Sequence, residues 1–389
     1  MSTLKLVNNT GLKTERNLCY VNASLQLLFS LKEFRDFFKS YQYKLNYQEK
    51  MPVCEELSRI FRTDGRFRTT AAELRRLVRN HYNRLDINDG MQQDLEEFHR
   101  MILEMLEKEL SNAGLPASMF VKKFWGRQQE RKKFVDSKEG LCNKGHQPRI
   151  EEENFMTIKL DVPSTHLQIS LNDMMHNYFS EGTSLILMKC SDCCKHSRDC
   201  PQNGDCKLKG ATIKRNLVTA PTYLYIQLLR FSNFQSPKTE TKVMPENELV
   251  LPNQERYTLI SIANHLGYFI GSGHYQALIK CGTKWTTADD EAALDTCKDK
   301  EINGNNYIFV YQKTGSTIQL KPNESNKTQS FNLKEIETGK KRKLSPKSKI
   351  NVCTEKQEGK IQKIVNNLKE GMEENNNNEN IGEKLRRKN

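Results

Sequence analysis

Residues 16–30 read RNLCYVNASLQLLFS and place a cysteine directly before an apolar run. Val21, Leu25 and Leu28 recur at helical spacing within that run. We therefore expect a buried helix that begins near Cys19. The N-terminal end of a helix favours negative charge, and the thiolate is the reactive form of cysteine. Cys19 is a candidate nucleophile, and on these residues alone a core cysteine remains the alternative.

The composition suggests that part of the chain does not fold. Only 36% of the 389 residues are hydrophobic. The net charge is +13, and residues 314–389 contribute +7 of it, with 17 Lys and Arg against 10 Asp and Glu. This basicity raises nucleic-acid binding as an alternative function, but no nucleic-acid-reading motif accompanies it.

Cysteine usage and hydropathy indicate a compartment. The 11 cysteines are odd in number, and their spacing is typical of metal or catalytic sites, which favours reducing surroundings. Residues 1–10, MSTLKLVNNT, contain no apolar signal core, and no run approaches the roughly 18 apolar residues of a membrane span. We expect a soluble intracellular protein without a membrane partner.

The pattern along the chain changes from helical to strand-like at about Phe120. Residues 50–110 have helical apolar spacing. The later segments with strand-like alternation are residues 155–162, 222–231, 257–265, 274–281, 284–288 and 306–313. Helices followed by strands predict an α+β fold.

The character changes again after Lys313. The remaining 76 residues have one aromatic side chain, Phe331, and an asparagine-rich run at 373–380, so we expect a disordered basic tail over residues 314–389. Within it, KKRKLSPKSK at 340–349 is typical of a nuclear import signal. The alternative is a solvated basic linker, so we expect localisation to the nucleus, the cytoplasm or both.

A nucleophilic cysteine needs a base, a group that orients the base, and donors for the oxyanion. Asn17 offers a side-chain donor near the thiol. His274 is the best base, because two glycines precede it and strand-like residues follow it. Asp289 and Asp290 follow after one strand and a turn, which is enough chain to bring an acid back to His274.

Four blocks of sequence extend this pattern to a known family. They are GLKTERNLCYVNASLQLL from Gly11, QQDLEEF at 92–98, LYIQLLRF at 224–231, and HLGYFIGSGHYQA from His265 with WTTADD from Trp285. In this order they resemble the ubiquitin-specific proteases, papain-like deubiquitinating cysteine proteases. NYIFVYQK at 306–313 resembles the closing strand of the family domain.

The resemblance implies a domain plan. It implies a catalytic domain over residues 1–313 with thumb, fingers and palm. The helical thumb would cover about 10–118, and the β-rich palm and fingers about 119–313, with finger cysteines between 142 and 206.

The resemblance also implies roles for individual residues. By position in the family motifs, Cys19 matches the nucleophile, Asn17 the oxyanion donor, His274 the general base and Asp289 the orienting acid. Asp290 is the second candidate for that acid.

The implied substrate is ubiquitin, joined through its C-terminal glycine to a lysine. Asp94 resembles the family acid that holds the basic ubiquitin tail, and Gln93 beside it is a further substrate-binding candidate. Tyr275 resembles the aromatic residue that lines the glycine channel. A surface acid on a charged helix is the alternative for Asp94.

The remaining cysteines resemble the zinc-binding fingers of this family. Cys142 and His146 would join Cys190 and Cys193 in one structural Cys3His zinc site. Two alternatives stay open: a site built from Cys190, Cys193, Cys200 and Cys206, and a degenerate finger with free cysteines. No organic cofactor is expected.

The resemblance predicts a thiol-dependent deubiquitinase that acts on ubiquitin and ubiquitinated proteins and is assumed to be a monomer. The alternatives are a catalytically weak ubiquitin-binding scaffold and a protease for a ubiquitin-like modifier.

Overall fold

The structure is a computed structural model. It describes residues 12–13, 17–40, 50–62, 70–84, 87, 92–114, 123–134, 149–180, 184–188, 209–233, 235–291, 295–297 and 302–316. The chain divides into one unit of Met1–Ile318 and another of Gln319–Asn389. All described residues belong to the first unit; they include residues 314–316 of the predicted tail, and residues 317–389 lie outside them.

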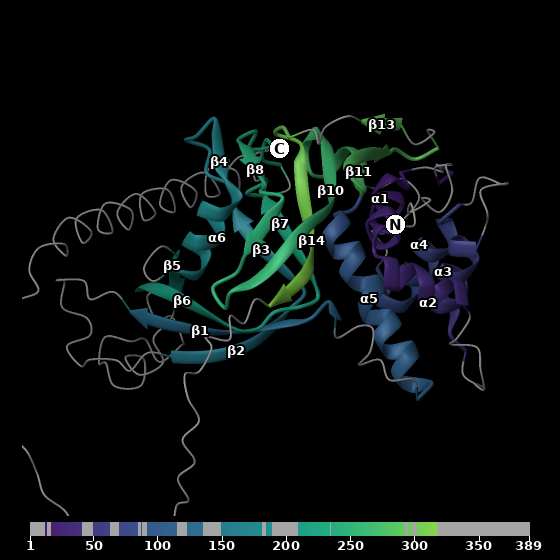
Figure 1. Ribbon diagram of the computed structural model, residues 1–389, viewed down its shortest axis with the longest axis horizontal. Coiled ribbons are helices and arrows are strands. Elements are labelled where there is room, and N and C mark those ends of the chain that lie inside the picture. Colours follow the sequence, from purple (N-terminus) through teal and green to yellow (C-terminus); the bar gives the residue numbers. More distant parts are fainter. Residues whose placement is uncertain are drawn as a thin grey trace, which may run out of the picture. The chain divides into compact units, whose positions relative to one another are not determined.

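In the described residues helices come first and strands follow, with α6 among the strands (Figure 1). The described helices are α1 Cys19–Ser30, α2 Lys32–Ser40, α3 Pro52–Arg62, α4 Ala72–Tyr82, α5 Leu95–Asn112 and α6 Leu171–Phe179. The described strands are β1 Gly126–Phe134, β2 Arg149–Phe155, β3 Thr157–Asp161, β4 Gln168–Ser170, β5 Ser184–Met188, β6 Lys209–Thr219, β7 Tyr223–Leu229, β8 Lys242–Met244, β9 Glu248–Val250, β10 Glu255–Phe269, β11 Ser272–Cys281, β12 Lys284–Ala288, β13 Asp295–Cys297 and β14 Asn306–Ser316.

The described strands form three sheets. The largest has eight strands in the order β13-β12-β11-β10-β14-β7-β3, with β9 paired to β10. A second sheet has the order β2-β1-β6-β5, and β4 pairs with β8 in parallel. All neighbours in the large sheet are antiparallel except β3 and β7.

The large sheet separates two hydrophobic cores. Along β14, Ile308 and Val310 join the core shared with α1–α5, whereas Phe309 and Tyr311 join the core that includes α6. This alternation follows from the two-residue period of a strand. Figure 1 shows α1–α5 gathered on one side of the sheet and α6 on the other. Side chains buried on both faces explain the nearly continuous apolar residues of β7.

Helix α1 lies at the centre of the helical core. Every residue from Cys19 to Leu28 is buried, and the helix contacts α2, α5, β10 and β11. A helix that is apolar on most of its surface must be covered on most of its surface. This packing fixes the first residue of α1, Cys19, against the strand that carries His274.

Two carboxylates cap the helices α5 and α3. Asp94 is the N-cap of α5 and accepts a hydrogen bond from the Glu97 N–H at 3.0 Å. Glu109, near the end of α5, accepts from the N–H groups of Val53 and Cys54 at 2.9 Å each and so caps α3. Helices α3 and α5 are therefore joined through their ends.

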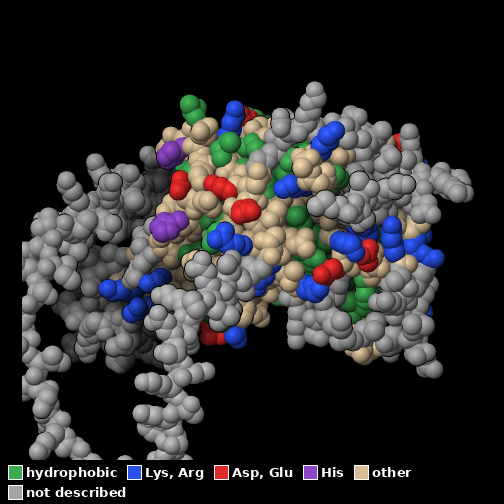
Figure 2. Space-filling view, viewed as in Figure 1, with side chains coloured by type: hydrophobic (Ala, Val, Ile, Leu, Met, Phe, Trp, Pro, Cys, Tyr) green, Lys and Arg blue, Asp and Glu red, His purple; other side chains and the backbone are tan. Residues whose placement is uncertain are grey.

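The structure confirms the α+β fold, the helix that begins at Cys19 and the strand positions predicted from alternation. It adds α6 inside the region expected to be β-rich. Strand β14 also runs to Ser316, past the predicted domain end at Lys313. No described helix has both the length and the hydropathy needed to cross a membrane. On the face in Figure 2, described acidic and basic side chains are both present, so that face does not carry charge of one sign.

Candidate active site

Cys19 is the first residue of α1, and 3% of it is exposed. Asn17 precedes it at φ 56°, in the left-handed region that asparagine tolerates better than most residues. The chain turns there and enters the helix at Leu18. The thiol therefore lies where helix N–H groups favour a negative charge.

His274 and Asp289 meet because β11 and β12 are antiparallel neighbours. Ala277 pairs with Ala288, so the residue after β12 returns beside the start of β11. The Nε2–H of His274 donates to Oδ1 of Asp289 at 2.5 Å. The Nε2–H of Gln276 donates to the other oxygen, Oδ2, at 2.6 Å. Both oxygens of Asp289 are thus held, and the imidazole plane is fixed.

Cys19 completes this line of side chains. A hydrogen bond between the Cys19 thiol and His274 raises the pKa of His274 to about 9, against desolvation and with help from Asp289. Because Nε2 is used by Asp289, Nδ1 is the ring nitrogen left for the thiol. A thiol beside an imidazole is the arrangement of a cysteine nucleophile and its general base.

Asp290 has a different partner. It accepts a hydrogen bond on Oδ1 from Nδ2 of Asn22 at 2.8 Å, and its Oδ2 lies 3.9 Å from Nδ1 of His274. Asn22 belongs to α1, one turn after Cys19. Asp290 therefore connects the acid-bearing turn to α1, whereas Asp289 holds the imidazole.

These acids also form a group of potential metal ligands. The ligand atoms of His274, Asp289 and Asp290 lie within 4.8 Å of one another. Hydrogen bonds within the protein already engage both oxygens of Asp289 and one of Asp290. Orientation of the imidazole accounts for this arrangement.

Gln92 also contacts the thiol of Cys19. Its Nε2 donates to Sγ of Cys19 at 3.4 Å and also to the carbonyl oxygen of Gly273. Gln92 is buried, although Gln93, which follows it, is half-buried. The sequence analysis selected Gln93 and Asp94 from this block and missed Gln92.

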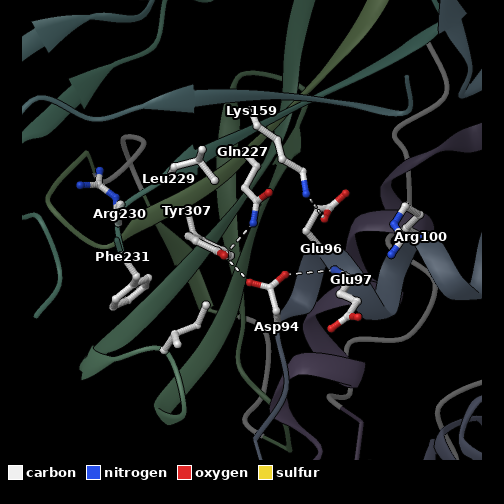
Figure 3. A pocket seen from close by; sticks show the side chains of 11 residues that line it. Asp94, Glu96, Glu97, Arg100, Lys159, Gln227, Leu229, Arg230, Phe231 and Tyr307 are labelled. Carbon is white, nitrogen blue, oxygen red and sulfur yellow. Dashed lines mark hydrogen bonds and ion pairs between the residues drawn. The ribbon is translucent and has the colours of Figure 1, made fainter. Parts of the chain in front are cut away.

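A pocket of about 360 Å³ lies at the start of α5 (Figure 3). Its lining is Asp94, Glu96, Glu97, Arg100, Lys159, Gln227, Leu229, Arg230, Phe231, Ile270 and Tyr307. Asp94 accepts a hydrogen bond from the Tyr307 hydroxyl, which in turn accepts from Nε2 of Gln227 at 2.7 Å. Burial raises the pKa of Asp94, and the hydrogen bonds from Tyr307 and the Glu97 N–H oppose that rise. A cationic guest would also favour the carboxylate form.

Two other acids of the pocket have cationic partners. Glu96 pairs with Lys159 at 2.9 Å, and Glu97 pairs with Arg84 at 2.7 Å. Asp94 is thus the pocket acid whose hydrogen-bond donors are neutral groups, a hydroxyl and a backbone N–H, while Lys159 acts on its charge without a hydrogen bond to it in the described residues.

Tyr275 lies in the core rather than at an open surface. It is 1% exposed, and its ring centroid is 4.7 Å from that of His265. Successive side chains of a strand point to opposite faces, so Tyr275 points away from the side of β11 that His274 and Gln276 share.

The predicted metal ligands Cys142, His146, Cys190 and Cys193, and the alternative ligands Cys200 and Cys206, lie outside the described residues.

The positioning residues have weak sequence signals. Gln276 follows His274 by two, which places both on one face of β11, and Asn22 follows Cys19 by three, which places both on one face of α1. These spacings, and the Gln-Gln-Asp motif for Gln92, could have drawn attention to all three residues. Tyr307 has no such signal, because its contact with Asp94 joins residues more than 200 positions apart.

Comparison with protein-family models identifies the family of this chain. The model of the family described as ubiquitin carboxyl-terminal hydrolase matches residues 10–311. The chain belongs to this family. The resemblance to ubiquitin-specific proteases is therefore confirmed.

Relatives in this hydrolase family share low sequence identity with the chain. Ubiquitin carboxyl-terminal hydrolase 26 of Arabidopsis thaliana is 24% identical over 72% of this chain and 26% of its own length. Probable ubiquitin carboxyl-terminal hydrolase 16 of Schizosaccharomyces pombe is 23% identical over 87% of this chain and 73% of its own length. The chain thus spans about a quarter of the first relative and about three quarters of the second.

A solved structure shows the same fold. The SAGA Ubp8/Sgf11/Sus1/Sgf73 DUB module bound to ubiquitin aldehyde aligns with a TM-score of 0.58 and 17% identity, over 81% of this chain and 72% of that chain. The papain-like fold predicted from the sequence is confirmed. The division into thumb, palm and fingers stays a prediction, in which helices α1–α5 would form the thumb, the large sheet the palm, and the sheet β2-β1-β6-β5 the base of the fingers.

Proposed function

We propose that this hydrolase-family chain is a thiol-dependent deubiquitinase that cleaves the bond between the C-terminal glycine of ubiquitin and a lysine or peptide nitrogen. The observation that carries the proposal is the continuous line from Cys19 through His274 to Asp289 at the start of α1. Family membership supports ubiquitin as the substrate.

The reaction follows from this geometry. The thiolate of Cys19 attacks the glycine carbonyl carbon, and the carbonyl oxygen becomes an oxyanion that the Asn17 side chain stabilises. The imidazolium of His274 gives its proton to the departing nitrogen, the C–N bond breaks, and a thioester remains on Cys19.

Water then completes the cycle. His274, now neutral, takes a proton from a water molecule as that water attacks the thioester carbon. The C–S bond breaks, ubiquitin leaves as a carboxylic acid that ionises in the solvent, and the thiolate–imidazolium pair is restored. Asp289 keeps the imidazole in one orientation through both halves of the reaction.

The pocket at the start of α5 fits a basic peptide tail. Asp94 offers a carboxylate whose hydrogen-bond donors are neutral groups, and Leu229, Phe231 and Ile270 add apolar walls. We infer that Gln93 and Asp94 bind the segment before the ubiquitin glycines. Tyr275 is 1% exposed, so it would pack beneath this binding site rather than line it.

One experiment separates this function from the alternatives. The purified protein is incubated in parallel with ubiquitin and ubiquitin-like modifiers that carry a C-terminal electrophile. We expect a covalent adduct with the ubiquitin probe that maps to Cys19. An adduct only with another modifier would change the substrate, and ubiquitin binding without any adduct would indicate a scaffold.

We also propose a structural zinc held by Cys142, His146, Cys190 and Cys193. Strand β1 ends where β6 begins, with Phe134 paired to Ala211, and β5 ends where β6 begins, with Met188 paired to Lys209. The two strands that lead into the ligand pairs, β1 and β5, therefore finish at the same end of this sheet, beside the first residues of β6. Three thiolates and one imidazole suit tetrahedral zinc, and four protein ligands would make it structural.

Elemental analysis tests this site. We expect about one zinc per chain, and Cys190→Ser should release it and lower the thermal unfolding midpoint, because metal-binding energy contributes to folding. Cys200→Ser serves as the comparison, since zinc loss there would favour the alternative ligand set. A metal-free preparation of unchanged stability would indicate a degenerate finger.

A further inference from the structure

Gln92 lies at the meeting point of three chain segments. It precedes α5 by three residues, its amide contacts the first residue of α1, and it also contacts the residue before His274. The amide nitrogen has two hydrogens, and the two acceptors, Sγ of Cys19 and the Gly273 oxygen, use both of them.

The orientation of this amide is determined by its surroundings. The reversed amide would place Oε1 against a carbonyl oxygen and a sulfur, both of which are acceptors. In the observed orientation Oε1 is buried and has no hydrogen-bond partner within the described part of the chain. A native protein rarely leaves a buried acceptor unpaired, and such groups gather at functional sites. The amide keeps this orientation at the cost of an unpaired Oε1, so the two hydrogen bonds donated by Nε2 determine its orientation.

The second acceptor is equally constrained. Gly273 has φ +141°, and a Cβ at this position would collide with the carbonyl oxygen of Leu266. Glycine therefore permits this close approach of β10 and β11 before His274, and its carbonyl oxygen is an acceptor for Gln92. With one N–H of the Gln92 amide bonded to Gly273, the other N–H of the same amide points toward the Cys19 sulfur.

The chemistry of the sulfur decides what this contact does. A neutral thiol is a weak acceptor, whereas a thiolate is a charged acceptor that forms a much stronger hydrogen bond. An amide N–H stabilises the thiolate by hydrogen bonding but cannot accept the proton of the thiol. Burial strengthens this hydrogen bond. Gln92 thus complements His274, which holds the proton that the thiol has lost.

We propose that Gln92 is a catalytic residue, which donates to the Cys19 thiolate and, through Gly273, sets the distance between the nucleophile and His274. This inference rests on the proposed function only for its kinetic consequence, because the reactivity of the thiol can be measured without ubiquitin. It assigns the first glutamine of the Gln-Gln-Asp block to the nucleophile and leaves Gln93 and Asp94 to the substrate.

The test uses two replacements of similar shape. Gln92→Met keeps the length and removes both donors, and Gln92→Glu keeps the shape but places a negative charge beside the sulfur. Gln168→Met, at the exposed first residue of β4, is the matched control. Thermal unfolding of each full-length variant establishes that it is folded.

The first measurement is the rate at which iodoacetamide alkylates Cys19 between pH 5 and 9, followed by peptide mass spectrometry. Alkylation of the half-buried Cys281 in the same sample is the internal reference. We expect Gln92→Met to slow Cys19 alkylation at pH 7 about tenfold and to move its pH midpoint up by about one unit, as the loss of one charge-assisted hydrogen bond requires. Gln92→Glu should slow it further, and Gln168→Met should leave it unchanged.

The second measurement is hydrolysis of a ubiquitin C-terminal reporter. Gln92→Met should lower kcat about tenfold or more and change KM less than about twofold, because the lost contact is to the reacting atom. Wild-type alkylation rates and pH midpoints in both folded Gln92 variants would overturn the inference. If Cys19 alkylation depends on Gln92 but the wild-type protein does not hydrolyse the reporter, the proposed function fails and this inference stands.

Discussion

Asp289 and Asp290 are adjacent in the chain but bind different groups. Asp289 accepts hydrogen bonds from His274 and Gln276, whereas Asp290 accepts one from Asn22 in α1. Asp290 also adopts φ 43°, which turns its side chain to that partner. At the scale of single residues, the acid that orients the imidazole is therefore separate from the acid that connects this turn to the nucleophile helix.

Replacement of each acid tests that division. Asp289→Ala should lower kcat by about 100-fold or more, because an unoriented imidazole loses most of its function as acid and base. Asp290→Ala should lower it by less than about tenfold. Reporter kinetics with circular dichroism as the folding control measure both effects. A larger loss for Asp290→Ala would move the orienting role to Asp290.

The raised pKa of His274 makes a second prediction at this scale. Protonated His274 contributes stability that is complete below its ordinary pKa of 6.5 and is lost as the pH rises through about 9. Hydrolysis should fall over the same upper limit, because the leaving nitrogen needs the imidazolium proton. NMR titration of the His274 ring should show its pKa lower in Cys19→Ala than in Asp289→Ala, since the contact with Cys19 is the larger cause. The reverse order would contradict this electrostatic description.

At the scale of elements, the active site is assembled by the packing of α1 against β11 and by the entry into α5. Helix α1 supplies Cys19, β11 supplies His274, and the segment before α5 supplies Gln92 and Asp94. Helix α5 is held in place at its far end by Glu109, which caps α3.

Removal of this cap should weaken the helical layer. Glu109→Ala leaves the N–H groups of Val53 and Cys54 without their acceptor, so the free energy of unfolding should fall by about 1–2 kcal/mol. Lys108→Ala, exposed on the same helix, should change it by less than about 0.5 kcal/mol. Urea denaturation followed by circular dichroism measures both. An equal effect of the two variants would show that the cap contributes nothing.

The elements differ in how far their sequence predicts them. Helix α1 and strands β7, β10, β11, β12 and β14 have strong apolar periodicity, so their type and approximate position could be predicted. The short helix α6 lies among strands and was missed. The last residues of β14, Thr314 to Ser316, lack apolar side chains, and they extend the strand through backbone pairing with β10, which the sequence does not reveal.

The proposed catalytic side chains follow from motifs, and spacing hints at Gln276, Asn22 and Gln92, but the contacts that these supporting residues make could not be predicted. Asp289 meets His274 because two strands pair in a register that the sequence suggests only by length. Gln92 reaches both Cys19 and Gly273 because three distant segments pack together, and Tyr307 reaches Asp94 for the same reason. Contacts of this kind depend on tertiary geometry, which local patterns do not encode.

At the scale of the whole molecule, the described residues form the part of the chain that carries every proposed catalytic group. The unit boundary at Ile318 follows shortly after β14. We propose that residues 319–389 serve localisation rather than chemistry, on the basis of the basic cluster at 340–343.

Truncation and substitution test this division of the chain. A protein that ends at Ile318 keeps all of β14, so its kcat/KM on the reporter should stay within about twofold of the full chain. In the full chain, alanine at Lys340, Lys341, Arg342 and Lys343 should move a fluorescent fusion from the nucleus toward the cytoplasm. Loss of activity on truncation would mean that the tail supports the catalytic unit, and an unchanged distribution would leave the cluster as a linker.

The central claim is that Cys19 is the nucleophile of a ubiquitin hydrolase. The most direct measurement is hydrolysis of a ubiquitin C-terminal reporter by the wild type and by Cys19→Ala, with ubiquitin affinity measured for both. We expect turnover by the wild type and less than about 1% of it in Cys19→Ala, because loss of a covalent nucleophile costs several orders of magnitude. Ubiquitin affinity should remain within about twofold. Residual turnover above about 1%, or a wild-type protein that binds ubiquitin without cleaving the reporter, would contradict the claim.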